Sequence, residues 1–333
     1  MHKLIPSAIL ALILIGCNET SELVQRTDYG RAQGSTYAIS YITGKDVKHQ
    51  SGIDSILQVI DKSMSTYQSN STISLINRGD TVPVDDHFWN VWLRSVDIWK
   101  ETGGLFDVTV YPLISLWNFE RKEQRIPDSL AVDSVLRYVG TDLVENVTQE
   151  NFWIPENVKL DFNAIAQGYT VDVICDYLEM NGIEHYLVEV GGELRTKGKN
   201  IDEQIWRIGI EKPEEEKQYE SFQKVIALEN AGLATSGSYR KFIEDTTTGD
   251  RYSHAVNPLT GYATNDPLMS VTVIANTTMD ADAYATALLV MGLDAATEFM
   301  NQRGDLAIYL IYFDKFKGWV ELSNDAFQAL DSK

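Results

Sequence analysis

Residues 279–292 read MDADAYATALLVMG and place two acids and a threonine at the start of an otherwise apolar segment. Asp280, Asp282 and Thr286 carry small oxygen-bearing side chains, whereas residues 288–291 belong in a core. On a helix, Asp282 and Thr286 are four positions apart and share one face. Taken alone, the stretch predicts a buried helix whose acids stabilise the helix dipole at its start. The alternative is that these oxygen-bearing side chains bind a small cation.

The rest of the chain mixes helices and strands without the regular alternation of a parallel doubly wound sheet. Apolar spacing predicts helices over 53–65, 86–101 and 163–180, the last closed by Asn181-Gly182. The β-branched and aromatic run at 34–43 predicts a strand, and later runs of the same kind lie at 185–190, 205–210, 222–229, 269–275, 306–312 and 318–322. The expected fold class is α+β.

The N-terminus reads MHKLIPSAILALILIGCNET, with a basic residue before an apolar run that is too short to span a bilayer. Leu14-Ile15-Gly16-Cys17 is similar to a bacterial lipobox. We therefore expect a lipoprotein signal peptide at 1–16, lipid attachment to Cys17, a polar tether at 17–28 and one folded domain at 29–333. An ordinary signal peptide cut elsewhere remains the alternative.

Charge and cysteine content narrow the function classes. The formal net charge of −20 disfavours nucleic acid and anionic lipid surfaces as partners. It also means that an anionic ligand would need a local cation. With Cys17 lipidated, the other cysteine, Cys175, has no internal partner, so we expect no disulfide framework.

Four further stretches contain glycines together with polar residues. Their letters are GGLFDVTVYPLISLWNF (103–119), LDFNAIAQGYTVDVICDYL (160–178), VEVGGELRTKG (188–198), and the pair ATSGSYRKF (234–242) with RYSHAVNPLTGYAT (251–264). Taken singly, each has a structural reading. Asp161 could cap a helix, the Gly191-Gly192 pair could be a turn, and His254 could be structural. A glycine pair after a strand can also let the backbone approach a ligand.

Together and in this order, the stretches resemble the ApbE family, the FAD:protein FMN transferases. The resemblance extends from GSTY at 34–37 through STYQSNSTISLIN at 65–77 to the DADAYAT helix. It implies two intimately packed α+β subdomains with mixed or antiparallel sheets. It also implies an enzyme that cleaves FAD with Mg²⁺, releases AMP and attaches FMN to Thr or Ser. The implied acceptor motif is Asp-x-x-Ser/Thr-Gly-Ala-Thr/Ser, in subunits of sodium-pumping NADH:quinone reductase (Nqr) or Rnf type.

The resemblance also assigns residues. The implied metal ligands are Asp282, Thr286 and the backbone carbonyl of Ala164, with Asp280 as a possible further ligand. Mg²⁺ suits such a set because it prefers oxygen ligands and takes the remainder from water and phosphate. His254 is the candidate that assists the acceptor hydroxyl. The residues expected around FAD are Gln33, Tyr67, Leu105, Phe106, Asp107, Asp161, Gln167, Gly191, Gly192, Ser236 and Ala255, with Gly237 in the same cavity.

Two positions depart from the family pattern. Gln167 stands where many relatives have Lys or Glu, and Leu259 stands where an Arg is common, so each removes a charge near the expected ligand. Two rival functions remain open: an FAD pyrophosphatase that releases FMN and AMP, and a non-catalytic FAD-binding lipoprotein. In each case we expect a lipid-anchored protein of the bacterial cell envelope, on the periplasmic or exterior face, with no nucleic-acid partner.

Overall fold

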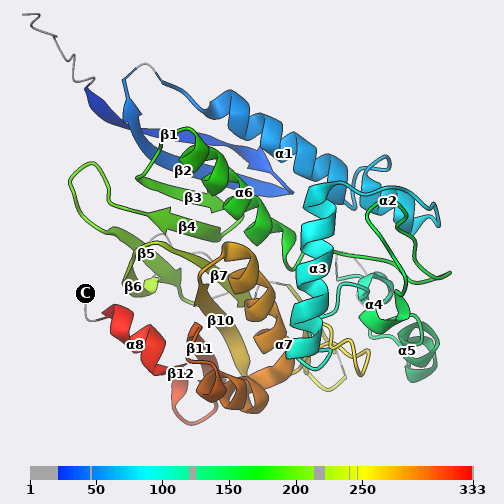
Figure 1. The fold of residues 1–333 in the computed structure, drawn as a ribbon. Coiled ribbons are helices and arrows are strands. Elements are labelled where there is room, and N and C mark those ends of the chain that lie inside the picture. The colour runs from blue at the N-terminus through cyan, green and yellow to red at the C-terminus, as the bar shows by residue number, and fades with distance from the viewer. Residues whose placement is uncertain are drawn as a thin grey trace, which may run out of the picture.

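The molecule is built around one antiparallel sheet of eight strands (Figure 1). The computed structural model describes residues 22–331, apart from 46, 120–124, 214–221, 240 and 246. The strand order is β1-β2-β3-β4-β7-β10-β11-β12, so strands from both halves of the chain join one sheet. The bounds are β1 Leu23–Ala32, β2 Ser35–Gly44, β3 Tyr186–Val190, β4 Glu193–Lys197, β7 Ala231–Gly237, β10 Leu268–Ala275, β11 Ala307–Asp314 and β12 Gly318–Ser323.

Helices cover one face of this sheet. Helix α1 (Gln50–Met64) and helix α6 (Ala166–Met180) pack on β2 and β3, and helix α7 (Thr278–Gln302) packs on β7 and β10. The opposite face is covered by the hairpin of β5 (Trp206–Glu211) and β6 (Phe222–Leu228) together with α8 (Asp325–Asp331). The sheet is therefore buried on both faces, and strand β10 accordingly has an almost continuous apolar run.

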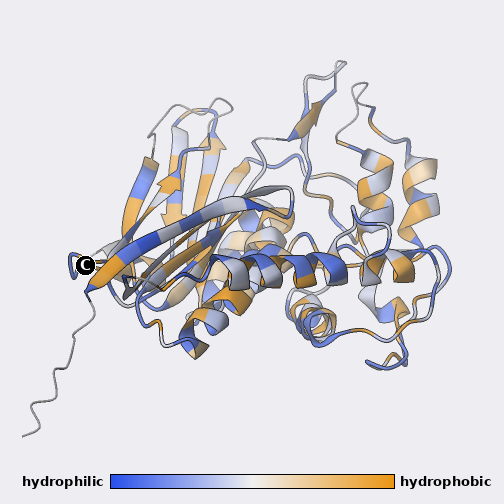
Figure 2. Ribbon diagram, turned by 90° about the horizontal axis from the view of Figure 1, so that it is seen from above, coloured by the Kyte–Doolittle hydropathy of each residue, from blue (hydrophilic) through white to orange (hydrophobic). Residues whose placement is uncertain are grey.

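The remaining helices form a second part of the molecule beside the sheet (Figure 1). They are α2 (Thr72–Asn77), α3 (Asp86–Glu101), α4 (Tyr111–Trp117), α5 (Ser129–Leu136) and a 3₁₀ turn at Thr141–Leu143. Helices α4 and α5 share a small core with the hairpin of β8 (Phe242–Glu244) and β9 (Arg251–Ser253). Figure 2 shows that apolar residues concentrate in the strands and on helix faces, whereas many of the connecting loops are polar.

Helix α7 contains residues 279–292, and it consists of two helical segments rather than one. Thr277 caps its start, because its hydroxyl accepts a hydrogen bond from the Asp280 amide at 3.2 Å. Gly292 interrupts the helix with φ 76°, a conformation that favours glycine. Asp266 then accepts from the Leu293 amide at 2.9 Å and caps the second part. The predicted buried helix is therefore present and ends where the sequence places its glycine.

Most of the predicted elements are confirmed. The α+β class is correct, α3 has the expected bounds, and α1 and α6 each begin three residues away from the expected start. Every pairing between named strands is antiparallel. The sequence reading omitted strands β1, β4 and β7, the short hairpin of β8 and β9, and the helices α2, α4, α5 and α8.

The expected tether at 17–28 is too long. Strand β1 begins at Leu23 and pairs with β2 along its whole length, so residues 23–28 belong to the sheet. The physical reason is that β1 is an edge strand with mostly half-buried side chains, so it lacks a strong apolar pattern. The expected signal peptide and Cys17 lie outside the described residues. Within the described part of the chain, no helix is long and apolar enough to cross a membrane.

Candidate metal and flavin site

The starts of α6 and α7 meet at the predicted metal ligands. Asp282, buried in α7, accepts a hydrogen bond through Oδ2 from the Gly168 amide in the first turn of α6 at 3.0 Å. Gly168 permits this contact, because a Cβ at that position would lie 2.8 Å from Asp282 Cβ. The geometry requires both the acid on α7 and the absence of a side chain on α6.

Thr286 lies one turn further along α7 and on the same face as Asp282. Its hydroxyl lies 3.1 Å from the Ser236 hydroxyl at the end of β7. Strand β7 pairs with β10, so the position of Ser236 is set by the sheet rather than by a loop. The structure therefore brings the predicted metal ligand Thr286 next to the predicted cavity residue Ser236.

The carbonyl of Ala164 lies just before α6 and completes the predicted set. The Gly168 amide donates to Asp282 and not to the carbonyl four residues earlier, so Ala164 O lacks the donor that a regular helix would give it. Carboxylate, hydroxyl and carbonyl oxygens are the ligands that Mg²⁺ prefers. The described residues include no group of three or more His, Cys, Asp or Glu side chains that could hold a metal. A cation bound at Asp282 would therefore need further oxygen ligands, of the kind that a hydroxyl and a carbonyl offer.

Burial makes the charge of this site costly without a cation. Burial raises the pKa of Asp282 to about 7, the Gly168 amide acts in the opposite direction, and the charge of Asp172 adds to the increase. Glu193, at the start of β4, is also buried, and its pKa is well above the ordinary range because of burial and the charge of Asp282. Glu193 Oε2 has no hydrogen-bond partner. Two buried acids with an unsatisfied oxygen fit a site that holds a cation.

The sequence analysis did not identify Glu193 or Asp172 as site residues. Both are ordinary acids in the sequence, and they become significant through the register of β4 and the packing of α6 on α7. The signal that could have found Glu193 is its place directly after the glycine pair Gly191-Gly192.

The turns at one end of the sheet hold three predicted flavin residues. Gln33 forms the β1–β2 turn with φ 52°, and its Nε2 donates to Thr170 Oγ1 on α6 at 2.6 Å. Its Oε1 is buried without a partner and can accept a hydrogen bond from a ligand. Gly191 and Gly192 form the β3–β4 turn with positive φ, and a Cβ on Gly191 would lie 2.2 Å from Gln167 Nε2. Gln33, Gln167 and the glycine pair therefore gather at the start of α6.

Asp107 and Asp161 are buried and hold loops. Asp107 accepts four hydrogen bonds, from the amide and hydroxyl groups of Thr109 and Thr141, at 2.6–2.9 Å. Asp161 accepts from the Asn163 amide at 2.8 Å, and its own amide donates to Val108 O at 2.7 Å. Burial raises the pKa of both acids. Both carboxylates therefore fix the loops that carry Leu105, Phe106 and Ala164.

A second group of predicted residues lies on two loops that touch, the loop after α3 and the turn after β9. Phe106 and Ala255 are buried in the same core as α7, and Leu105 packs against that core. Leu259 is 56% exposed, and its Cδ2 would lie 3.0 Å from a Cβ on Gly104. The turn with Leu259 therefore rests on the loop of Leu105 and Phe106, and Leu259 places an apolar side chain there.

His254 is exposed beside this turn. Its Nδ1 lies 3.3 Å from Lys241 O, and its amide donates to the same carbonyl at 3.0 Å. Because a carbonyl can only accept, this contact places the proton on Nδ1 and leaves Nε2 as an acceptor. The surrounding protein lowers the pKa of His254 through partial desolvation. The lowered pKa therefore favours the neutral ring, in which Nε2 is the acceptor atom.

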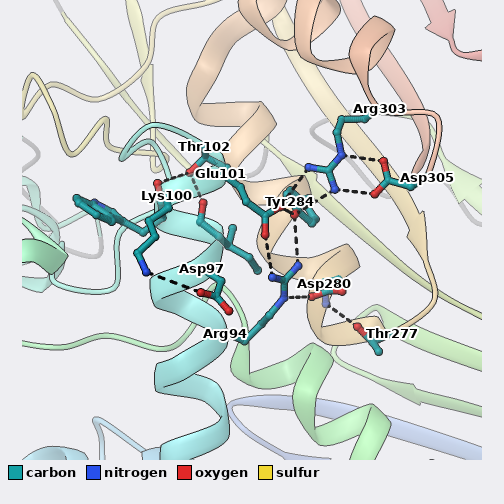
Figure 3. Close-up of polar contacts among 12 residues, drawn as sticks. Arg94, Asp97, Lys100, Glu101, Thr102, Thr277, Asp280, Tyr284, Arg303 and Asp305 are labelled. Atoms are coloured by element: carbon teal, nitrogen blue, oxygen red, sulfur yellow. Dashed lines mark hydrogen bonds and ion pairs between the residues drawn. The ribbon is translucent and has the colours of Figure 1, made fainter. Parts of the chain in front are cut away.

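Two further expectations concern Tyr67 and Asp280. Tyr67 is 81% exposed on the loop between α1 and α2, and the structure does not bury it with the other flavin residues. Asp280 accepts from Arg94 Nε on α3 at 2.6 Å, within a network that includes Glu101, Tyr284 and Arg303 (Figure 3). Asp280 therefore faces α3, and nothing in this arrangement favours it as a metal ligand.

The sequence model of the ApbE family matches residues 33–310. The FAD:protein FMN transferase of Haemophilus influenzae is 34% identical over 348 aligned residues, which cover 99% of each chain. The corresponding protein of Vibrio cholerae is 34% identical over 334 residues, with 97% of each chain covered.

Solved structures give the same result. The flavin transferase ApbE from Vibrio cholerae superposes with a TM-score of 0.82 at 32% identity, covering 93% of this chain and 100% of that one. The apo form of the Pseudomonas stutzeri flavinyl transferase ApbE gives a TM-score of 0.83 at 30% identity, with 92% and 97% covered. Full-length similarity in sequence and fold therefore defines this chain as a transferase of the flavin-transferring class. The chain belongs to the ApbE family.

Proposed function

We propose that this chain transfers FMN from FAD to a Thr or Ser hydroxyl of an acceptor protein, with Mg²⁺ as cofactor and AMP as the leaving product. The observation that carries the proposal is the contact of the Asp282 carboxylate with the first turn of α6. Thr286 offers a hydroxyl on the same face of α7, and the Ala164 carbonyl just before α6 lacks a helical donor. Asp282, Asp172 and Thr277 already occupy amides at these helix starts, so the bound cation would supply the charge that attracts phosphate. A site of this kind suits the pyrophosphate of FAD.

Asp282, Thr286 and the Ala164 carbonyl would hold Mg²⁺. Asp282 Oδ2 receives the Gly168 amide, so Oδ1 is the oxygen that is available for a cation. When bound, Mg²⁺ would offset phosphate charge and the charge that develops on the leaving AMP. This positive charge is needed locally, because the chain as a whole has a formal charge of −20.

Other residues would bind and orient the flavin. Gln33 Oε1 offers a buried acceptor to a ligand N–H group, and the turn at Gly191 lets the ligand approach the backbone. Leu105, which is only partly buried, offers an apolar surface on a loop that Asp107 and the buried Phe106 fix. Tyr67, being exposed, would contribute ring surface only if the bound ligand extends to its loop.

His254 would accept the proton of the acceptor hydroxyl through Nε2. The hydroxyl oxygen then bonds to the FMN-side phosphorus, and the bond from that phosphorus to the oxygen of AMP breaks. AMP leaves with the bonding electron pair, and the acceptor keeps FMN in a phosphoester. A lowered pKa keeps His254 neutral near pH 7, as a proton acceptor must be.

We further propose that the acceptor carries the motif Asp-x-x-Ser/Thr-Gly-Ala-Thr/Ser, in a redox subunit of Nqr or Rnf type. We also propose that the mature chain is a lipoprotein of the bacterial cell envelope, anchored through Cys17 on the periplasmic or exterior side. The support for the anchor is the sequence Leu14-Ile15-Gly16-Cys17. A Cys17→Ser variant should lose labelling by a palmitate analogue; labelling equal to the parent would refute the anchor.

The test is incubation of the chain with FAD, Mg²⁺ and an acceptor peptide that carries the motif, followed by mass spectrometry. Transfer predicts one FMN added to the peptide and one AMP released for each addition. Equal amounts of free FMN and AMP with unmodified peptide would instead indicate an FAD pyrophosphatase. Binding of FAD without AMP release, unchanged by a chelator, would indicate a flavin-binding protein. His254→Ala should slow the addition while FAD affinity stays within about threefold.

A further inference from the structure

Helices α6 and α7 are linked by two carboxylates, because an Asp on each helix accepts hydrogen bonds from backbone amides at the start of the other helix. Asp172 on α6 accepts from the first amides of α7, with Thr278 N at 3.0 Å from Oδ1 and Met279 N at 2.9 Å from Oδ2. In the other direction, Asp282 on α7 accepts from Gly168 N on α6 at 3.0 Å. Each helix therefore satisfies N-terminal amides of the other, which would otherwise lack partners.

Strand β4 fixes the first of these carboxylates. Arg195 Nη1 lies 2.8 Å from Asp172 Oδ1, and both side chains are largely buried, at 23% and 12% exposure. A charge-assisted bond of this kind is shorter and stronger than a neutral one. Because β4 lies in the middle of the sheet, Asp172 and Arg195 connect the start of α7 to the centre of the sheet.

The space around the start of α7 leaves no room for a shift. A Cβ on Gly168 would lie 2.4 Å from Thr278 O, and a Cβ on Gly232 of β7 would lie 2.5 Å from Thr278 N. The backbone of Thr278 is thus held between α6 and β7. Asp282 and Thr286 follow Thr278 by one and two turns, so their positions depend on how this start is held.

We propose that Asp172, oriented by Arg195, is a positioning residue that holds the start of α7 so that Asp282 and Thr286 face the same cation. Asp172 does not touch the substrates and acts through the two α7 amides. The inference rests on the proposed function, because it takes Asp282 and Thr286 as ligands. The competing reading is that Asp172 contributes only to stability, as helix caps in general do.

The test compares two isosteric variants of the full chain. Asp172→Asn removes the charge and can accept only through one oxygen, so one α7 amide loses its partner. Asp280→Asn is the matched control, because it also removes one carboxylate charge beside the start of α7. The Asp280 carboxylate, however, bonds to Arg94 on α3 and not to the α7 amides (Figure 3). The measurement is calorimetric titration of Mg²⁺ into each variant with FAD present, alongside FAD affinity without metal.

We expect Asp172→Asn to weaken Mg²⁺ binding about 10- to 100-fold, the range for residues that orient metal ligands. Metal-free FAD affinity should stay within about threefold, and Asp280→Asn should change Mg²⁺ affinity by less than about threefold. Equal losses in the two variants, or parental Mg²⁺ affinity in Asp172→Asn, would overturn the proposal.

A second variant covers the case in which Asp172→Asn does not fold. Arg195→Gln keeps the carboxylate on the α7 amides and removes only its orientation, so a smaller loss of Mg²⁺ affinity is expected. Unchanged affinity there, with Asp172→Asn unfolded, would leave Asp172 with a role in stability alone. The proposed function fails separately, if the parent binds Mg²⁺ and FAD but adds no FMN to an acceptor.

Discussion

At the scale of single residues, the main feature is a pair of buried acids, Asp282 and Glu193, that form no ion pair within the described part of the chain. Asp282 has its pKa raised to about 7, and Glu193 has its pKa raised well above the usual range. Arginines lie nearby in the fold, but Arg195 bonds to Asp172 and Arg94 bonds to Asp280. Both arginines therefore bond to other acids, which agrees with the proposal that Asp282 and Glu193 face a bound cation.

This arrangement predicts how stability changes with pH. Since folding raises the pKa of Asp282 and Glu193, the folded state binds more protons than the unfolded state between about pH 4 and pH 7. The contribution of these acids is complete below the unfolded pKa and declines as pH rises through about 7. The metal-free protein should lose on the order of 2 to 4 kcal/mol from Asp282 between pH 5 and pH 8.

Denaturant unfolding at pH 5, 6.5 and 8 measures this effect. Other buried acids, such as Asp161, titrate in the same direction, so the comparison is with Asp282→Asn. That variant should show a flatter profile than the parent, and Mg²⁺ with FAD should flatten the parent's profile too. Identical slopes of stability against pH for parent and variant would contradict the raised pKa of Asp282.

A second prediction at this scale separates the two metal ligands. Asp282→Ala removes the charged ligand and should abolish Mg²⁺-dependent transfer, whereas Thr286→Ala removes a neutral ligand and should reduce it less. If Asp282 served only the helix dipole, its loss would cost about 0.3 to 1 kcal/mol of stability and nothing else. The measurement is transfer rate against Mg²⁺ concentration, and an unchanged metal dependence in Asp282→Ala would exclude the site.

At the scale of elements, the crossing of α6 and α7 is the arrangement on which the site depends. The helices touch where Gly168 has no side chain, and this close approach brings the Asp282 carboxylate onto an α6 amide. Behind them, β7 supplies Ser236 and β4 supplies Glu193 and Arg195. Each residue of the metal site therefore comes from a regular element or from the turn directly before one.

This crossing predicts the effect of one methyl group. In Gly168→Ala the new Cβ would collide with Thr278 O, so α7 must move away from α6. We expect a loss of about 1 to 3 kcal/mol in the free energy of unfolding, together with weaker Mg²⁺ binding. Gly304→Ala is the control, because no atom lies within 4 Å of its added Cβ. A Gly168→Ala variant as stable as the Gly304→Ala control would show that the helices are not in close contact.

The sequence predicted those elements whose pattern is local. Helix α3 has buried Phe88, Val91 and Trp92 at helical spacing, and strand β10 contains the β-branched run VTVI at 271–274. Strands β4 and β7, with the letters ELRTK and AGLATSG, have no such pattern. They are strands because they fill the centre of the sheet, and tertiary context decides β structure more than propensity does.

The same distinction applies to the site. The resemblance supplied the metal role of Asp282 and Thr286, with which their spacing on one helix agrees, and it also supplied Ala164 and the flavin residues. Asp172 and Glu193 could not be identified in this way, because their roles depend on contacts between elements that are far apart in the sequence. Asp280 is within one turn of Asp282, yet its helical angle directs it to Arg94 on α3.

At the scale of the whole molecule, charge is the dominant property. A formal charge of −20 surrounds a site that must admit FAD, whose two phosphates are negative. Long-range repulsion of this kind slows association, and salt screens it over about 10 Å at 0.1 M. The negative surface therefore slows the approach of FAD, whereas the proposed metal site would attract its phosphates once FAD is close.

We expect FAD to associate faster as ionic strength rises. At fixed free Mg²⁺, raising KCl from about 20 to 200 mM should increase the association rate constant several-fold, because repulsion at a distance weakens. Stopped-flow flavin fluorescence measures this rate, and riboflavin, which has no phosphate, is the control that should not respond. A rate that falls with salt would show that the field at the entrance is positive despite the net charge.

Because β1 begins at Leu23, the tether of a protein anchored at Cys17 would be short, and this limits the distance between the site and the membrane. Leu23 begins the strand, so a lipid on Cys17 would leave a leash of six residues, at most about 20 Å long. Strand β1 then extends for ten residues, about 33 Å, to the turn of Gln33 at the flavin site. Acceptor hydroxyls would have to lie within about 50 Å of the bilayer. Enzyme and acceptor would then meet by lateral diffusion along one surface, at a frequency set by their density per unit area of membrane.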